Sequence, residues 1–346
     1  MLAVEADNDD ALTRLSTAAQ TIAPLLQLWL GAQPLTALTI LDHPGEPFQD
    51  GPLLVAPVDS LAAASSVPAL VHSLTHAWVQ TGQPWFDEGL PAFFGLLWTE
   101  QQQGRAVAIA QLADLIQPVA LAEPAFPPPA ATTASTEPTT PALKGTGLSP
   151  SVSTPQNAGA LAPEGQPLIS ASDDLYYRRK AAAVWWMLRG ITGDEPLIAA
   201  LTQWRDQPVS HDTPTAQAIA FEHLLEKTSG KDLAWFFADW ILRDRGLPDL
   251  TIVAVEPRQL PAGKGHDTGW LVAVTVRNDG AATADVPLII RSGTYSTTAR
   301  LRVAGFSSVT DRVVLEAPPT EVQLNDGATP EVRTSTHTQA VVLKTE

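Results

Sequence analysis

The chain has 346 residues, of which 45% are apolar and ten are tryptophan, so it can bury two or three domain cores, which excludes a wholly disordered protein. Its formal net charge is −16 without any basic run, which argues against a nucleic acid or an anionic membrane as partner. Cysteine is absent, so disulfides and thiolate metal ligands are excluded, and any bound metal must rely on histidine and carboxylate.

The start of the chain and the length of its apolar runs indicate in which cellular compartment the protein is expected. The first ten residues, MLAVEADNDD, are acidic and lack the pattern of a signal peptide. No apolar run approaches the roughly 20 residues that span a bilayer. We therefore expect no transmembrane segment, and a cytoplasmic protein as given, or a periplasmic or extracellular one if an N-terminal part is missing. The oligomeric state stays open.

Helical and strand-like patterns alternate over residues 1–122. Apolar side chains recur at helical spacing over 11–31, where Pro24 is expected to bend the helix. Short apolar runs then predict two strands, and longer periodic runs predict three further helices. The strands are expected at 35–41 and 52–58, and the helices at 67–81, 88–101 and 105–116.

Residues 123–168 differ in composition from the rest of the chain. They hold ten of the thirty prolines, among Ser, Thr, Ala and Gly, with almost no aromatic side chain. Such a segment cannot repay the entropy of ordering, so a disordered insertion is predicted. The alternative is a long, irregular but ordered loop.

Helical periodicity resumes at Asp174 and continues to about residue 242. Thr213 is expected as an N-cap, because Pro214 then takes the first helical position, which it favours. Four helices are predicted, at 174–193, 195–204, 213–230 and 229–242.

After Pro248 the hydrophobic period changes to two. Short alternating runs separated by Gly, Pro, Asn and Asp predict a small antiparallel β-sandwich of immunoglobulin-like type. Nine of the ten tryptophans precede this point, which indicates two separate cores. The predicted strands are 251–257, 269–280, 285–293, 297–305, 311–317 and 340–345.

His72 and His76 stand four residues apart in the apolar run VHSLTHAW. Positions i and i+4 share one face of a helix, so both imidazoles can face a single ion. Zinc takes about four ligands, and Glu88 can supply a third from the first turn of the next helix, with Asp87 as its N-cap. The alternative is that both histidines pack or cap within a core, because a chance His-x-x-x-His pair is expected in roughly one of seven such chains and is a weak signal alone.

The segment HSLTHAW…PWFDEGLPAFF, residues 72–94, resembles the His-Glu-x-x-His…Trp-Leu-x-Glu-Gly signature of gluzincin peptidases, in particular the aminopeptidase N-like zinc metallopeptidases of peptidase family M1. Two later segments are similar to helices of that family, in the same order: YYRRKAAAVWWMLRGITGDEPLIAAL and LLEKTSGKDLAWFFADWILRDRGLPDL. The resemblance implies a multidomain protein, in which a mainly α-helical zincin (thermolysin-like) catalytic domain is followed by a C-terminal β-sandwich.

The resemblance also implies a cofactor and a partner. His72, His76 and Glu88 match the family's three zinc ligands, so one zinc ion is expected, with a peptide or protein as substrate or ligand. The interval from His76 to Glu88 is shorter than in the best-known members, although related gluzincins also have shorter intervals.

Three positions depart from the family pattern. Ser73 stands at the position of the general-base glutamate, and a serine hydroxyl cannot take up a proton at neutral pH; losing a base typically removes about 10²–10⁴ of rate. Gln49 stands at the position of the glutamate that binds the substrate amine, where a neutral amide is a poor counter-ion. Arg178 stands at the oxyanion-stabilising tyrosine, and Tyr177 is the candidate for that role if the alignment shifts.

Four parts are therefore expected along the chain. They are the first part of a gluzincin catalytic domain with the zinc helices at 1–122, a disordered insertion at 123–168, the helical continuation of the catalytic domain at 169–247, and an immunoglobulin-like β-sandwich at 248–346. The family's N-terminal β-domain has no counterpart here, which implies a shortened, degenerate member.

Three functional hypotheses stay open, so whether the chain is an enzyme is undecided. The first is a zinc metallopeptidase whose catalysis is impaired because Ser73 replaces the general base. The second is a non-catalytic pseudopeptidase that binds a peptide or a protein. The third is a structural remnant without metal.

Overall fold

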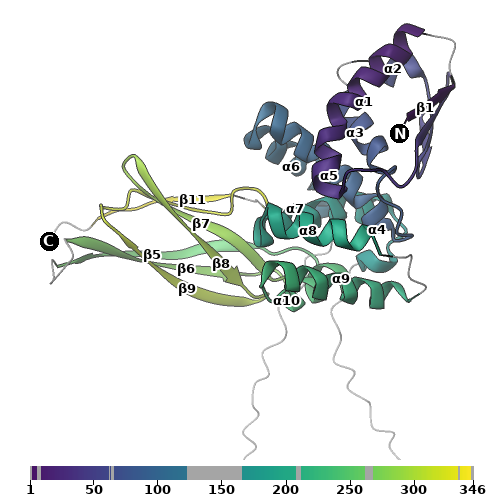
Figure 1. Cartoon of the computed structure of the whole chain (residues 1–346). Helices are drawn as coiled ribbons and strands as arrows, with labels where there is room; N and C mark the ends of the chain where they lie inside the picture. The colour runs from purple at the N-terminus through teal and green to yellow at the C-terminus, as the bar shows by residue number, and fades with distance from the viewer. Residues whose placement is uncertain are drawn as a thin grey trace, which may run out of the picture.

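The computed structural model describes residues 2–5, 9–61, 63, 66–122, 166–207, 212–261, 268–333 and 336–343. Helices and one small sheet form the part drawn on the right of Figure 1, and two larger sheets extend from it to the left. Within the described part of the chain, the buried apolar side chains form one large cluster in the helical part and a second cluster in the two larger sheets.

A small sheet packs against the first long helix, α1 (Asp9–Leu30), which contains Pro24. Its strand order is β1-β2-β4-β3, with β1 (Leu2–Glu5), β2 (Leu38–Asp42) and β4 (Leu53–Ala56) parallel and β3 (Phe48–Asp50) antiparallel. The predicted strands at 35–41 and 52–58 correspond to β2 and β4. The other two strands were not predicted, because β3 is an exposed edge of three residues and β1 stands in an acidic start without alternation.

The helices that follow are α2 (Val58–Leu61), α3 (Val67–Thr75), α4 (Pro84–Asp87), α5 (Gly89–Gln103) and α6 (Arg105–Ala122). The predicted helix at 67–81 is wrong at its end, because the backbone tightens to i→i−3 bonds: Ala77 N donates to Leu74 O at 3.0 Å and Trp78 N to Thr75 O at 2.8 Å. His76 therefore lies on a tight turn just past α3.

Asp87 is not the N-cap of α5, contrary to the prediction. Its carboxylate instead accepts hydrogen bonds from the backbone N of Thr81 at 2.7 Å, the hydroxyl of Thr81 at 2.9 Å and the backbone N of Gly82 at 2.7 Å. Asp87 thus ties the turn after His76 to α4, and Glu88 occupies the N-cap position without capping through its side chain.

The second helical stretch begins with the short 3₁₀ helix η2 (Leu168–Ser170) and the π-helix η3 (Leu175–Lys180). The helices α7 (Ala181–Thr192), α8 (Asp194–Arg205), α9 (Pro214–Ser229), α10 (Ala234–Phe237) and the π-helix η4 (Ala238–Leu242) follow. Thr213 caps α9 as predicted, since its hydroxyl accepts a hydrogen bond from Ala216 N at 3.3 Å.

The predicted insertion at 123–168 lies mostly outside the described residues, which end at 122 and resume at 166. Leu168 is fully buried in the helical core, so the end of the predicted range belongs to the packed structure. Composition does not reveal this, because a single leucine after Pro167 carries no periodic signal.

A tryptophan pair joins the segment around α4 to α7. The Trp85 and Trp185 rings stack at a centroid distance of 4.9 Å, and Trp185 Nε1 donates to Trp85 O at 3.0 Å. Both side chains are fully buried. This contact brings the chain next to Glu88 against the helix that continues η3.

Gly89 is expected to resist substitution, because a Cβ there would lie 2.6 Å from Ala181 Cβ on α7. Gly89→Ala should therefore destabilise the protein by about 1–3 kcal/mol, although alanine favours helices. Gly95→Ala on the same helix is the matched control, since the nearest atom would lie at 3.7 Å, and it should be neutral or stabilising by up to about 1 kcal/mol. Denaturant unfolding measures both, and equal effects of the two variants would contradict the prediction.

The C-terminal part contains two antiparallel sheets that share one hydrophobic cluster. One sheet is ordered β5-β6-β9 and the other β11-β10-β7-β8. The strands are β5 (Leu250–Leu260), β6 (Gly269–Asn278), β7 (Ala284–Ser292), β8 (Tyr295–Val303), β9 (Ser307–Leu315), β10 (Glu321–Leu324) and β11 (His337–Ala340).

Two predictions in this part are wrong. The short strand β10 was missed, and of the described residues 340–343 in the predicted strand at 340–345 only Ala340, the last residue of β11, is in a strand. Both errors concern strands of four residues, which are too short to show a clear alternation. The sheets join the helical part through Trp240, whose Nε1 donates to Thr283 O at 2.9 Å, and through Asp239, which accepts from Thr283 N at 3.0 Å.

Among the described helices, α6 is the one long and apolar enough, by length and composition alone, to cross a membrane. The sequence analysis predicted that no apolar run approaches the length of a membrane span, and it did not single out this helix. In this structure α6 buries one side, including Leu112 and Ile116, against the helical core.

Candidate metal centre

The side chains of His72, His76 and Glu88 lie together. His72 comes from the last turn of α3, His76 from the tight turn after it, and Glu88 from the junction of α4 and α5. The Nε2 atom of His72 is 3.6 Å from Glu88 Oε2, and the Nε2 atom of His76 is 3.8 Å from Glu88 Oε1. One donor atom from each residue lies within 4.8 Å of the other two, as a shared ion would require.

His76 shows that a metal ion fits this donor set. The residue is only 1% exposed, and its Nε2 is buried without a hydrogen-bond partner in the part of the chain that the structure describes. Burial and the neighbouring His72 lower the pKa of His76 to about 4, although Glu88 acts in the opposite direction. The imidazole is therefore neutral at pH 7, which is the form that binds metal, and an ion would satisfy the buried nitrogen.

Glu88 is held by a cation of the chain itself. Arg178 donates to Glu88 Oε2 from Nε at 3.1 Å and from Nη2 at 2.7 Å. Burial raises the pKa of Glu88, but the neighbouring imidazoles of His72 and His76 and the bonds from Arg178 together lower it to about 2. Glu88 is therefore an ionised carboxylate at any ordinary pH, and the arginine expected at the oxyanion position instead faces this carboxylate.

Ser73 and Gln49 contact each other. Ser73 Oγ donates to Gln49 Oε1 at 2.7 Å, and Gln49 Nε2 donates to the backbone oxygen of Gly51 at 3.0 Å. Gln49 belongs to the short strand β3 and Ser73 to α3, where it is 5% exposed. The two residues that stand at the base and amine positions of the resemblance are thus brought together, as a neutral hydrogen-bonded pair.

Tyr177 is half-buried on η3 and makes no hydrogen bond to the histidine cluster within the described structure. The adjacent Tyr176 packs against the helical core, with Lys180 Nζ 5.8 Å from its ring centroid. The oxyanion role that the resemblance gives Tyr177 therefore stays a prediction.

Sequence reasoning missed two acidic residues that pair with cations of η3. Asp174 Oδ1 lies 3.0 Å from Arg178 Nη1, and their i, i+4 spacing is a signal that could have been used. Asp244 pairs with Lys180, and both side chains are completely buried. No sequence signal connects these two residues, which are 64 positions apart.

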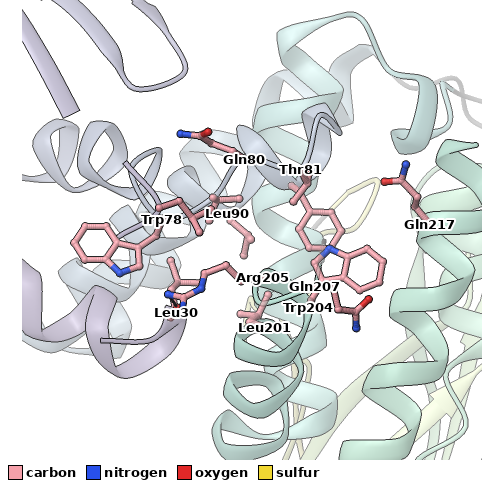
Figure 2. A pocket seen from close by; sticks show the side chains of 13 residues that line it. Leu30, Trp78, Gln80, Thr81, Leu90, Leu201, Trp204, Arg205, Gln207 and Gln217 are labelled. Carbon is pink, nitrogen blue, oxygen red and sulfur yellow. Dashed lines mark hydrogen bonds between the residues drawn. The ribbon is translucent and has the colours of Figure 1, made fainter. Parts of the chain in front are cut away.

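A separate pocket of about 290 Å³ is lined in part by residues 78–81, which follow His76. In Figure 2, Trp78 and Leu30 lie at one end of it and Trp204 and Gln217 at the other. Its lining combines aromatic and aliphatic side chains with the amides of Gln80, Gln207 and Gln217. None of the histidine-cluster residues lines it.

No protein-family model and no curated protein matches the chain. Solved structures do match. Aminopeptidase A from Legionella pneumophila, in a crystal structure with aspartic acid, superposes with a TM-score of 0.57 and 14% identity, over 92% of this chain and 34% of that chain. A mutant M1 zinc metallopeptidase from Deinococcus radiodurans gives a TM-score of 0.41 and 18% identity, over 67% and 45% of the two chains. The second value is too low to establish a shared fold.

The first superposition shows that this chain has a fold like that of part of an aminopeptidase. The helical part and the sheets that follow it fit that multidomain architecture. The chain spans about a third of the length of the Legionella protein.

Proposed function

We propose that this chain is an aminopeptidase-like zinc metallopeptidase of the M1 type, a degenerate member whose catalysis is impaired. The observation that carries the proposal is the buried, unpartnered Nε2 of His76, which faces Glu88 beside His72. Two imidazoles and one carboxylate are the ligand set of many catalytic zinc sites. The fold similarity to an aminopeptidase supports the same conclusion.

A zinc ion held by His72, His76 and Glu88 would polarise a substrate carbonyl and activate water for attack on it. The chain's own residues supply little of the remaining chemistry. The Ser73 hydroxyl is buried and donates its proton to Gln49, so it offers no basic group. Gln49 carries no charge for a substrate amine. Hydrolysis is therefore expected to be slow, even with zinc bound.

The alternative is a non-catalytic pseudopeptidase that binds a peptide or a protein. The observation that favours it is the pocket in Figure 2, whose volume of about 290 Å³ lies near the lower end for ligand sites. The apolar lining residues could bind one apolar side chain of a peptide, while the glutamine amides could hydrogen-bond to its backbone.

The metal content of the purified protein tests the proposal. Protein stripped with a chelator and then reloaded should hold about one zinc ion per chain, and His76→Ala should lose most of this zinc. His43→Ala is the matched control, because His43 is exposed and lies outside the cluster. Atomic emission after gel filtration measures the content. Equal zinc in all three proteins, or none in the wild type, would contradict the proposed site.

A further inference from the structure

Arg178 binds the same carboxylate that the proposed zinc ion needs. The two hydrogen bonds that it donates to Glu88 both go to Oε2, the oxygen that also lies 3.6 Å from His72 Nε2. We propose that Arg178 and a divalent cation compete for Glu88, so that Arg178 holds the carboxylate in the metal-free protein and lowers the affinity for zinc. This inference rests on the proposed zinc site.

The competition follows from charge and from geometry. A carboxylate oxygen that accepts two bonds from a guanidinium has few lone-pair directions left for an ion. A guanidinium and a divalent cation on one carboxylate also repel each other. Of the two oxygens, Oε1 faces His76 and Oε2 faces His72. An ion that binds between His72 and Glu88 Oε2 therefore needs the oxygen that Arg178 now occupies.

Arg178 has a second partner to which it can withdraw. Its Nη1 lies 3.0 Å from Asp174 Oδ1, one helical turn earlier on the chain. The side chains of Arg178 and Asp174 are 40% and 41% exposed, so the pair reaches solvent. Arg178 can thus leave Glu88 without losing a carboxylate partner. Asp174 favours the open, metal-binding arrangement.

Arg179 provides a matched control. It stands next to Arg178 on η3 and its Nε lies 3.3 Å from Asp174 Oδ2, yet it makes no contact with Glu88 in the described structure. Removing Arg179 takes away the same charge from the same helix. It should leave the competition for Glu88 unchanged.

The test is the zinc dissociation constant, measured by competition with a chromophoric chelator. Arg178→Met should bind zinc about tenfold more tightly than the wild type; the half-exposed guanidinium is screened by water, so a much larger effect is not expected. Arg179→Met should stay within about twofold of the wild type. Asp174→Asn should bind zinc more weakly, because Arg178 then keeps Glu88 as its main partner. Arg178→Gln serves as a second variant if thermal unfolding shows that Arg178→Met does not fold.

Different outcomes separate this inference from the function on which it rests. If Arg178→Met and Arg178→Gln bind zinc no more tightly than the wild type, the competition is overturned, while the zinc site itself stands. If Arg179→Met strengthens binding as much as Arg178→Met, only net charge matters, and the competition for Glu88 is also overturned. If no variant binds zinc better than His76→Ala, the proposed function and this inference both fall.

Discussion

Ser73→Glu is expected to raise zinc-dependent hydrolysis of aminoacyl or peptide reporters by about tenfold to a hundredfold over the wild-type protein. This gain is less than the full rate factor of about 10²–10⁴ that a general base typically supplies. Ser73 follows His72 on α3, so the new carboxylate would reach the edge of the histidine cluster and could accept a proton from water there. The substrate-amine position would still hold the neutral Gln49, and the oxyanion position would still hold Arg178, so a full gain is not expected.

The Ser73–Gln49 pair makes this substitution feasible in a nearly buried place. Gln49 Oε1 now accepts from the serine at 2.7 Å, and a rotated Gln49 amide could instead donate its NH₂ group to the new carboxylate. Ser73→Gln is the control, because the glutamine side chain has nearly the same shape as glutamate but carries no charge. Adding His76→Ala to Ser73→Glu should abolish the gain.

Reporter assays with and without a chelator decide between the two proposed functions. Rapid, chelator-sensitive turnover by the wild type would show that catalysis is not impaired and that another group serves as base. A Ser73→Glu variant that binds zinc but stays at background would show that Ser73 is not the residue that limits catalysis. The pseudopeptidase alternative would then be the better description.

Lys180→Met is expected to destabilise the protein by about 3–5 kcal/mol. Lys180 and Asp244 form an ion pair in which both side chains are completely buried, and Asp244 also accepts from Gly246 N at 3.1 Å. Removing the lysine leaves a carboxylate in the core without its counter-charge. Because Lys180 ends η3 and Asp244 follows η4, the loss should loosen the contact between these two π-helices.

A double variant separates loss of the pair from loss of packing. Asp244 has a φ of 52°, in the left-handed region that asparagine tolerates, so Asp244→Asn should not change the backbone conformation there. Lys180→Met combined with Asp244→Asn should recover part of the stability lost by Lys180→Met alone, because no unpaired charge is then buried. Denaturant unfolding measures each variant, with Arg179→Met as a partly exposed control. A loss below about 1 kcal/mol for Lys180→Met would refute the prediction.

The sequence predicted that His72, His76 and Glu88 lie together, because its signals are local. Two histidines at i and i+4 and a Glu-Gly at the start of the next helix are visible within 18 residues, and the structure places all three side chains together. The strands β2 and β4 and most helices were predicted for the same reason, since each has its own period.

The features that sequence reasoning missed depend on contacts between distant segments. Arg178 was assigned to the oxyanion position by alignment, yet its partner Glu88 is 90 residues away and no pattern links the two. The contact between Gln49 and Ser73 spans 24 residues and depends on how the edge strand β3 lies beside α3. Such pairings appear only when the packing of the elements is known.

The stacked indoles of Trp85 and Trp185 give the molecule an optical reporter. Two parallel rings at 4.9 Å couple their electronic transitions, so the pair should contribute an exciton couplet to circular dichroism. One indole lies three residues before Glu88 and the other on the helix that continues η3. Any movement of Glu88 relative to that helix, including exchange of a guanidinium for an ion, would change the ring geometry and could be followed in real time, without a dye or a substrate.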